Sequence, residues 1–93
     1  MLKATLLCLI ASPALADGPV CMPREELIAK LDEDYSERNM ARGMETRGGI
    51  VEVYVSPKGT WTMAVIPPTE GVLQACPIAA GTDWKMIIPG IDG

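Results

Sequence analysis

Histidine and phenylalanine are both absent from this chain of 93 residues. Without histidine, a serine or cysteine nucleophile lacks the base that most often activates it. A pair made by Ser56 and Lys58 is the one substitute, but Lys58 falls in a turn, where its ammonium group would stay solvated. The sequence therefore predicts a protein that is not an enzyme, and nothing in it indicates a cofactor.

The lack of phenylalanine leaves two tryptophans and two tyrosines as the only aromatic residues, beside six methionines. We therefore expect Tyr35, Trp61, Trp84 and the methionines to supply much of the bulk of the core. Thioethers also suit Cu(I), which makes copper handling an alternative use of these methionines. The dense methionine clusters and histidines typical of copper sites are missing, so packing is the favoured interpretation.

Long apolar runs are lacking too, and the longest one lies at the N-terminus. Lys3, the apolar segment 5–10 and the sequence Ala14-Leu15-Ala16 form the pattern of a secretory signal peptide over residues 1–16. The segment is far shorter than the ~20 residues of a membrane-spanning helix. We expect cleavage to leave residues 17–93 as one small domain, periplasmic or secreted, without membrane attachment.

Basic residues are scarce in that domain. The eight lysines and arginines include Lys3, so seven remain against twelve acidic residues, a net charge of about −5. Nucleic acids and anionic membranes select proteins with a basic surface, so neither is an expected partner. An acidic surface is compatible with a basic protein partner.

Cysteine is rare, and Cys8 would leave with the signal peptide. The remaining pair, Cys21 and Cys76, predicts one disulfide in an oxidising compartment. The chain-entropy model assigns such a bridge roughly 4 kcal/mol of stability. Two separate thiols or a metal pair are the alternatives, but zinc prefers four ligands and the chain has no histidine.

Hydrophobic periodicity changes once along the domain. Leu27, Leu31 and Tyr35 recur every four residues and predict a helix that begins at Pro23 and ends near Arg38 or Asn39. Period-two patterns follow and predict strands over residues 40–46, 50–56, 60–66 and 72–80, with a last short strand or turn over 84–88. The expected fold is α+β, with one N-terminal helix packed on an antiparallel meander of four to five strands.

Several short stretches stand out along the chain: "DYSE" at residues 34–37, "GGIVEV" at 48–53, "SPKGTWT" at 56–62, a late cysteine and "AAGTDW" at 79–84. Their succession resembles small exported proteins from alphaproteobacteria. The resemblance covers nearly all of the mature chain and is carried by turn and strand residues. It implies an exported single domain, and it assigns no activity and no catalytic residue.

Acidic residues gather in "DEDYSE", residues 32–37, which makes calcium handling a further alternative. The EF-hand pattern requires alternating ligands around a glycine, and no such glycine is present. Paired carboxylates for glycosidase chemistry would need a cleft that the sequence does not indicate. A solvated helix face is the favoured interpretation, and we assign no metal ligands.

The stretch "SPKGTWTM", residues 56–63, combines lysine, glycine and threonine. A phosphate-binding loop would need a leading glycine and a following helix, and both are missing. Proline at the second position and Gly59 at the fourth predict a type I turn at a hairpin tip. Trp61 then lies either in the core, which we favour, or on an open face of the sheet beside Tyr54.

We expect a non-enzymatic, exported binding or accessory domain whose partner is another protein. The candidate binding surface consists of Tyr54, Lys58, Trp61 and Trp84. Inhibition of a basic periplasmic or host enzyme is one alternative, because opposite charge would steer such an association. Metal handling, with copper or calcium, is the other.

Overall fold

The computed structural model describes residues 20–90 and shows an α+β domain. Its elements, in chain order, are β1 (Met22–Pro23), α2 (Arg24–Tyr35), β2 (Arg38–Met44), β3 (Ile50–Val55), β4 (Trp61–Ile66) and β5 (Gln74–Gly81). The predicted fold class is confirmed. The predicted signal peptide, residues 1–16, lies outside the described residues. Within residues 20–90, no helix has the length and apolar character needed to cross a membrane.

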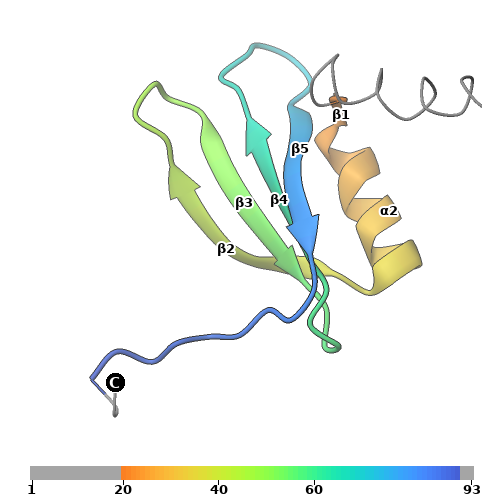
Figure 1. Cartoon of the computed structure of the whole chain (residues 1–93). Helices are drawn as coiled ribbons and strands as arrows, with labels where there is room; N and C mark the ends of the chain where they lie inside the picture. The colour runs from red at the N-terminus through yellow and green to blue at the C-terminus, as the bar shows by residue number, and fades with distance from the viewer. Residues whose placement is uncertain (1–19, 91–93) are drawn as a thin grey trace, which may run out of the picture.

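The strands form one antiparallel sheet in the order β1-β5-β4-β3-β2. Strands β2 to β5 are neighbours in chain order, which is the predicted meander. The two-residue strand β1 extends the sheet by pairing Met22 with Ala75. Because β1 leads directly into α2, the helix begins at the β5 edge and lies along one face of the sheet (Figure 1).

Helix α2 ends earlier than predicted. Ser36 takes a left-handed conformation at φ 58°, and its N–H donates to the carbonyl of Asp32. The N–H of Glu37 donates to the carbonyl of Leu31, so two backbone hydrogen bonds cap the end of the helix. Asn39, the predicted end of the helix, pairs instead with Tyr54 as part of β2. The left-handed turn at Ser36 therefore sends the chain straight into the sheet.

The core lies between α2 and the sheet. It consists of Leu27, Leu31, Tyr54, Ala64, Ile66 and Ala75. Tyr35 was expected to continue the Leu27–Leu31 stripe, but its side chain is 58% exposed. Met40, Met44 and Met86 are exposed as well. The expectation that Tyr35 and the methionines fill the core was wrong in these places, because Tyr35 is the last residue of α2 and Met40 and Met44 lie on β2, whose residues are all exposed.

The hairpin tip at residues 56–60 has the predicted turn. The N–H of Gly59 donates to the carbonyl of Ser56, and Gly59 has φ 95°, which glycine adopts without strain. Residues 84–88, predicted as a short strand or a turn, form neither. After Gly81 the chain turns at Asp83 (φ 58°) and runs away from the sheet (Figure 1).

A disulfide joins Cys21 and Cys76, as predicted, across 55 positions of sequence. The two Cα atoms lie 4.1 Å apart, beside the Met22–Ala75 pair of β1 and β5. The bridge therefore fastens the segment that leads into α2 to an inner strand of the sheet. Such crosslinks persist in oxidising compartments.

Candidate functional site

The two central strands carry different side chains on their two faces. Successive residues of a strand point to opposite sides, and directly paired residues share a side. Glu52 and Tyr54 of β3 point toward α2, as do Thr62, Ala64 and Ile66 of β4. We call this side the covered face.

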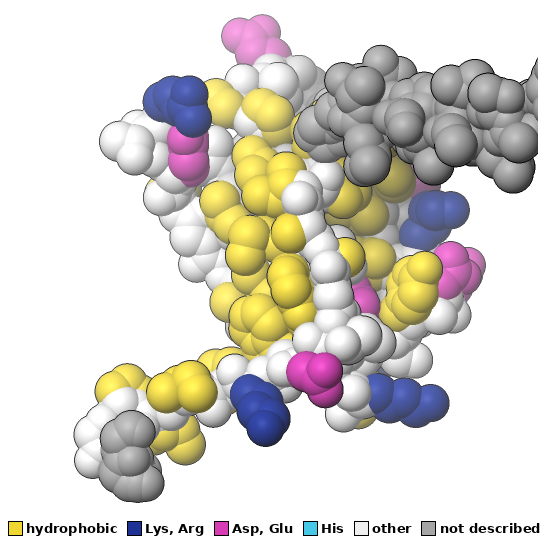
Figure 2. All heavy atoms as spheres, viewed as in Figure 1, with side chains coloured by type: hydrophobic (Ala, Val, Ile, Leu, Met, Phe, Trp, Pro, Cys, Tyr) yellow, Lys and Arg dark blue, Asp and Glu magenta, His cyan; other side chains and the backbone are white. Residues whose placement is uncertain are grey.

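The opposite side, which we call the open face, is formed by Val51, Val53, Val55, Trp61, Met63 and Val65. These residues make three cross-strand pairs, Val51–Val65, Val53–Met63 and Val55–Trp61. Every side chain in the set is apolar, and only Val53 is buried, at 8% exposure, while the other five are half-buried. Figure 2 shows a column of hydrophobic side chains over β3 and β4 without a charged side chain within it.

Trp61 stands at the end of the open face and is held from three sides. Its indole Nε1–H donates to the carbonyl of Thr82 at 3.2 Å, and its ring lies against that of Trp84 with the centroids 5.7 Å apart. Gly81, its cross-strand partner, leaves room for the ring, since a Cβ there would lie 3.1 Å from three ring atoms. Our preference for Trp61 in the core was wrong, because the register places it on the open face, half-buried.

Three of the four predicted surface residues lie at one end of the molecule. The N–H of Trp84 donates to the carbonyl of Gly59 at 3.0 Å, so Trp84 lies beside the hairpin tip that carries Lys58. Trp61 packs on Trp84 at the same end. Tyr54 does not join them. It lies on the covered face with 1% of its surface exposed, so its ring belongs to the core.

Tyr54 instead belongs to a buried polar network around Glu52, which is 1% exposed. Arg24 donates to both carboxylate oxygens of Glu52, at 2.9 and 2.8 Å. Arg42 donates twice to Oε2, at 3.0 and 2.8 Å, and the hydroxyl of Tyr54 donates to Oε1 at 2.5 Å. One carboxylate thereby links α2, β2 and β3.

The network changes the acidity of two of its members. Burial by itself would raise the pKa of Glu52, but the hydrogen bonds from Arg24, Tyr54 and Arg42 outweigh burial and lower that pKa from 4.5 to about 2. Burial, followed by the hydrogen bond to Glu52, raises the pKa of the Tyr54 hydroxyl. The carboxylate is fully supplied with donors, so we assign it a structural role.

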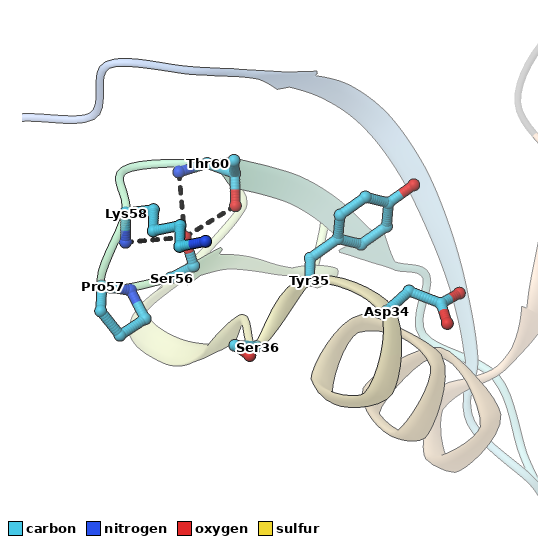
Figure 3. Close-up of a pocket in the computed structure, with 7 residues that line it drawn as sticks. All are labelled: Asp34, Tyr35, Ser36, Ser56, Pro57, Lys58 and Thr60. Atoms are coloured by element: carbon cyan, nitrogen blue, oxygen red, sulfur yellow. Dashed lines mark hydrogen bonds between the residues drawn. The ribbon is translucent and has the colours of Figure 1, made fainter.

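A hollow of about 320 Å³ separates the end of α2 from the hairpin tip (Figure 3). Ser56 organises the tip, because its Oγ accepts hydrogen bonds from the N–H groups of Lys58 and Thr60 and from the Thr60 hydroxyl. Tyr35 projects from the helix on the other side of this hollow, while Asp34 points away from it (Figure 3).

A second hollow lies between α2 and the strands β4 and β5, with a volume of about 520 Å³. We call it the Glu37 groove. Its walls include Leu27, Leu31, Tyr35, Glu37, Thr62 and Pro77. Glu37 is 3% exposed, and its Oε1 accepts a hydrogen bond from the Thr62 hydroxyl at 2.7 Å. The groove shares Tyr35 and Thr60 with the first hollow, so the two adjoin.

Metal-ligating residues are not brought together in the described part of the chain. Residues 20–90 contain no group of three or more acidic or cysteine side chains placed to hold a metal ion. Met44 pairs with Ile50 on the side of the covered face, whereas Met63 lies on the open face. The geometry therefore favours neither the copper nor the calcium alternative.

Sequence reasoning did not find Glu52 or Glu37. For Glu52 a signal was present, because it alternates with Tyr54 on one side of "IVEVYV" while three valines occupy the other. A carboxylate next to a tyrosine on a strand face indicates a buried polar pair when arginines are near. Glu37 gave no such signal, since its burial follows from the left-handed turn at Ser36.

Comparisons with known proteins give no further guide, because no family model, no curated protein and no solved structure matches the chain.

Proposed function

We propose that this protein is an exported, non-enzymatic binding domain that acts on another protein in the periplasm or outside the cell, and that the open face is its contact surface. The observation that carries the proposal is the distribution of side chains between the two faces. An antiparallel sheet normally packs its apolar face on the core and turns its polar face to water. Here the wholly apolar face is the one without a helix.

Within residues 20–90, Thr82 and Trp84 contact the open face only at its Trp61 end. Helix α2 lies on the other side of the sheet, and the segment after Gly81 runs away from it (Figure 1). Contiguous exposed apolar surface on a small protein marks an interaction site. Trp61 and Trp84 add the aromatic surface that is enriched at the centres of protein interfaces.

Charge favours a different protein over a second copy as the occupant. The domain has a net charge of about −5 once Lys3 is discounted, so two copies repel each other while a basic partner is attracted. The disulfide between Cys21 and Cys76 supports the proposed periplasmic or secreted location.

The test is affinity capture from a native envelope extract with the oxidised protein and one matched pair of variants. Met63→Gln places an amide in the middle of the open face. Met44→Gln makes the same change at a side chain that is 76% exposed on β2. We expect one captured protein to be lost with Met63→Gln and retained with Met44→Gln.

Two results would overturn the proposal. In the first, the two variants retain the same proteins as the wild type, so that capture does not depend on the open face. In the second, sedimentation velocity shows a dimer that Met63→Gln dissociates, which would make the open face a self-association surface. Trp61 and Trp84 are the only tryptophans in the chain, so intrinsic fluorescence reports directly on this site.

Inhibition of a basic periplasmic or host enzyme is the second candidate, and the acidic net charge is the observation that favours it. Electrostatic steering would make the association rate fall steeply with salt. Incubation with a basic hydrolase such as lysozyme at low ionic strength should then slow substrate turnover. Full enzyme activity at a molar excess of the oxidised protein would remove this candidate.

A further inference from the structure

The covered face holds two carboxylates that are equally buried but differently paired. Glu52 is 1% exposed and accepts four hydrogen bonds from two guanidinium groups and one from a tyrosine. Glu37 is 3% exposed, and among the described residues only the Thr62 hydroxyl donates to it. No ion pair within residues 20–90 includes Glu37.

The difference matters because a buried carboxylate is costly unless a positive group offsets the lost hydration. At Glu52 the protein provides two arginines for this purpose. At Glu37 the one bound donor, the Thr62 hydroxyl, is neutral. Glu37 also lines the hollow of about 520 Å³, and none of the described residues that line this hollow is a lysine or an arginine.

The other walls of the Glu37 groove define what fits beside the carboxylate. Leu27, Leu31 and Pro77 offer apolar surface, which suits an aliphatic stem. Tyr35, which is 58% exposed, lines the same hollow and can offer its aromatic face to a cation. A carboxylate, an aromatic ring and apolar walls together complement a positive head group on a hydrocarbon chain.

We propose that the Glu37 groove binds an ammonium or guanidinium group carried on an aliphatic stem, with Glu37 as the charge partner of the cation. The groove lies on the α2 side of the sheet, and Trp61, at the end of the open face, also lines it. The proposal goes beyond the function proposed above and does not rest on it. Two sources supply this chemistry, a free alkylamine or the lysine or arginine side chain of a polypeptide.

The first experiment titrates the oxidised protein with hexylammonium and, separately, with 1-hexanol, while NMR follows the methyl groups of Leu27 and Leu31 and the amide of Thr62. We expect saturable shifts with both, and binding of hexylammonium about tenfold tighter, because only the ammonium forms a charge-assisted hydrogen bond. Equal affinities would reduce the groove to an apolar hollow, and no saturable shift would remove the site.

A capped peptide, Gly-Gly-Lys-Gly-Gly, distinguishes the two sources. A polypeptide source predicts tighter binding of the peptide than of hexylammonium, since the flanking backbone adds contacts at the rim. A free-amine source predicts the reverse order. Failure of both probes would contradict the proposal.

Two variants distinguish the effect of the charge of Glu37 in the groove from the effect of the net charge of the protein. Glu37→Gln keeps the acceptor for the Thr62 hydroxyl and should weaken hexylammonium binding about tenfold while leaving hexanol binding unchanged. Glu33→Gln removes the same charge from an exposed position of α2 and should change neither. Equal losses in the two variants would show that only net charge matters.

Tyr35→Ala tests the site without risk to the fold, because this ring is not part of the core. It should weaken hexylammonium binding several-fold and leave the circular dichroism spectrum and Tm unchanged. Unchanged affinity in both Tyr35→Ala and Glu37→Gln would overturn the assignment.

Discussion

A half-buried antiparallel sheet usually packs its apolar face on the core and exposes its polar face to water. The two faces of this sheet have the reverse arrangement. The covered face places Glu52, Thr62 and Ser56 among its buried residues, and Glu37 is buried against it. The open face, formed by the same two strands, presents only valines, Trp61 and Met63. A domain that worked alone would gain stability by turning the valines toward the helix.

The comparison shows that the register was not chosen for maximal burial of apolar surface inside one chain. A shift of one residue would exchange the two faces of a strand. The Glu52 network opposes such a shift, because Arg24 of α2 and Arg42 of β2 reach the carboxylate only from the covered side. Polar contacts thus fix the register and leave the apolar face without a helix, and under the proposed function this face meets the partner.

The largest expected effect on stability comes from the disulfide that joins the segment before α2 to β5. Replacing Cys21 and Cys76 together by serine should lower the free energy of unfolding by about 4 kcal/mol, because the closed loop spans 55 positions. Urea unfolding of the oxidised wild type and the double variant measures the difference. Wild type with dithiothreitol is the control and should match the variant. Equal midpoints under all conditions would contradict a stabilising bridge.

Glu52→Gln should follow, with a loss of about 3 kcal/mol. The amide keeps the size of the side chain, but it leaves Arg24 and Arg42 without an anionic partner. Val51→Thr, the neighbouring position on the open face, is the matched control and should change stability far less. If both variants unfolded at the same urea concentration, the covered face would not depend on its ionic network.

The Glu52 network also makes the free energy of unfolding depend on pH. The pKa of Glu52 is lowered from 4.5 to about 2, so its contribution is present at neutral pH and is lost as the pH falls between these values. A shift of this size corresponds to about 3 kcal/mol. As the pH falls through this range, the free energy of unfolding of the wild type should decrease. The decrease for Glu52→Gln over the same range should be about 3 kcal/mol smaller, because the amide does not titrate. Parallel acid-unfolding curves for the two proteins would argue against this assignment.

At the open face, Gly81→Ala should have a smaller effect, about 1 kcal/mol. The added Cβ would lie 3.1 Å from three atoms of the Trp61 ring, which must move outward. We expect a red shift of tryptophan emission, because the displaced ring meets more water. Gly43→Ala, which has nothing within 4 Å of the added Cβ, is the control. Unchanged emission in Gly81→Ala would mean that the ring does not rest on Gly81.

The α+β fold was predictable because it depends on local patterns, and the disulfide was predictable because only two cysteines remain outside the predicted signal peptide. The four-residue spacing of Leu27 and Leu31 and the β-branched run at 50–55 specify their elements without knowledge of the partner segments. The end of α2 was not predictable from propensity, because Ser36 adopts a left-handed conformation that is uncommon for residues other than glycine.

The candidate site was harder to predict because it depends on which face of each strand meets the helix. Both faces of β3 are compatible with burial, and the more apolar one was the natural choice for the core. That assumption favours Trp61 in the core and Tyr54 at the surface, the reverse of what the register gives. Only contacts distant in sequence, such as Arg24 with Glu52, decide between the two arrangements.

The smallest expected effect on stability is also the sharpest test of the difference between the faces. Met63→Gln should change the free energy of unfolding of the isolated protein by no more than about 0.5 kcal/mol, since the side chain is already partly exposed there. Ile66→Thr, three residues later on the covered face, should cost about 2 kcal/mol, because it removes a buried methyl group and buries a hydroxyl.

If the open face is a contact surface, the order of the two variants reverses for partner affinity, measured by the tryptophan fluorescence of the complex. Met63→Gln then weakens binding strongly, while Ile66→Thr, below its own unfolding transition, binds as wild type. If Ile66→Thr reduced both stability and partner affinity more than Met63→Gln does, both faces would serve the fold alone.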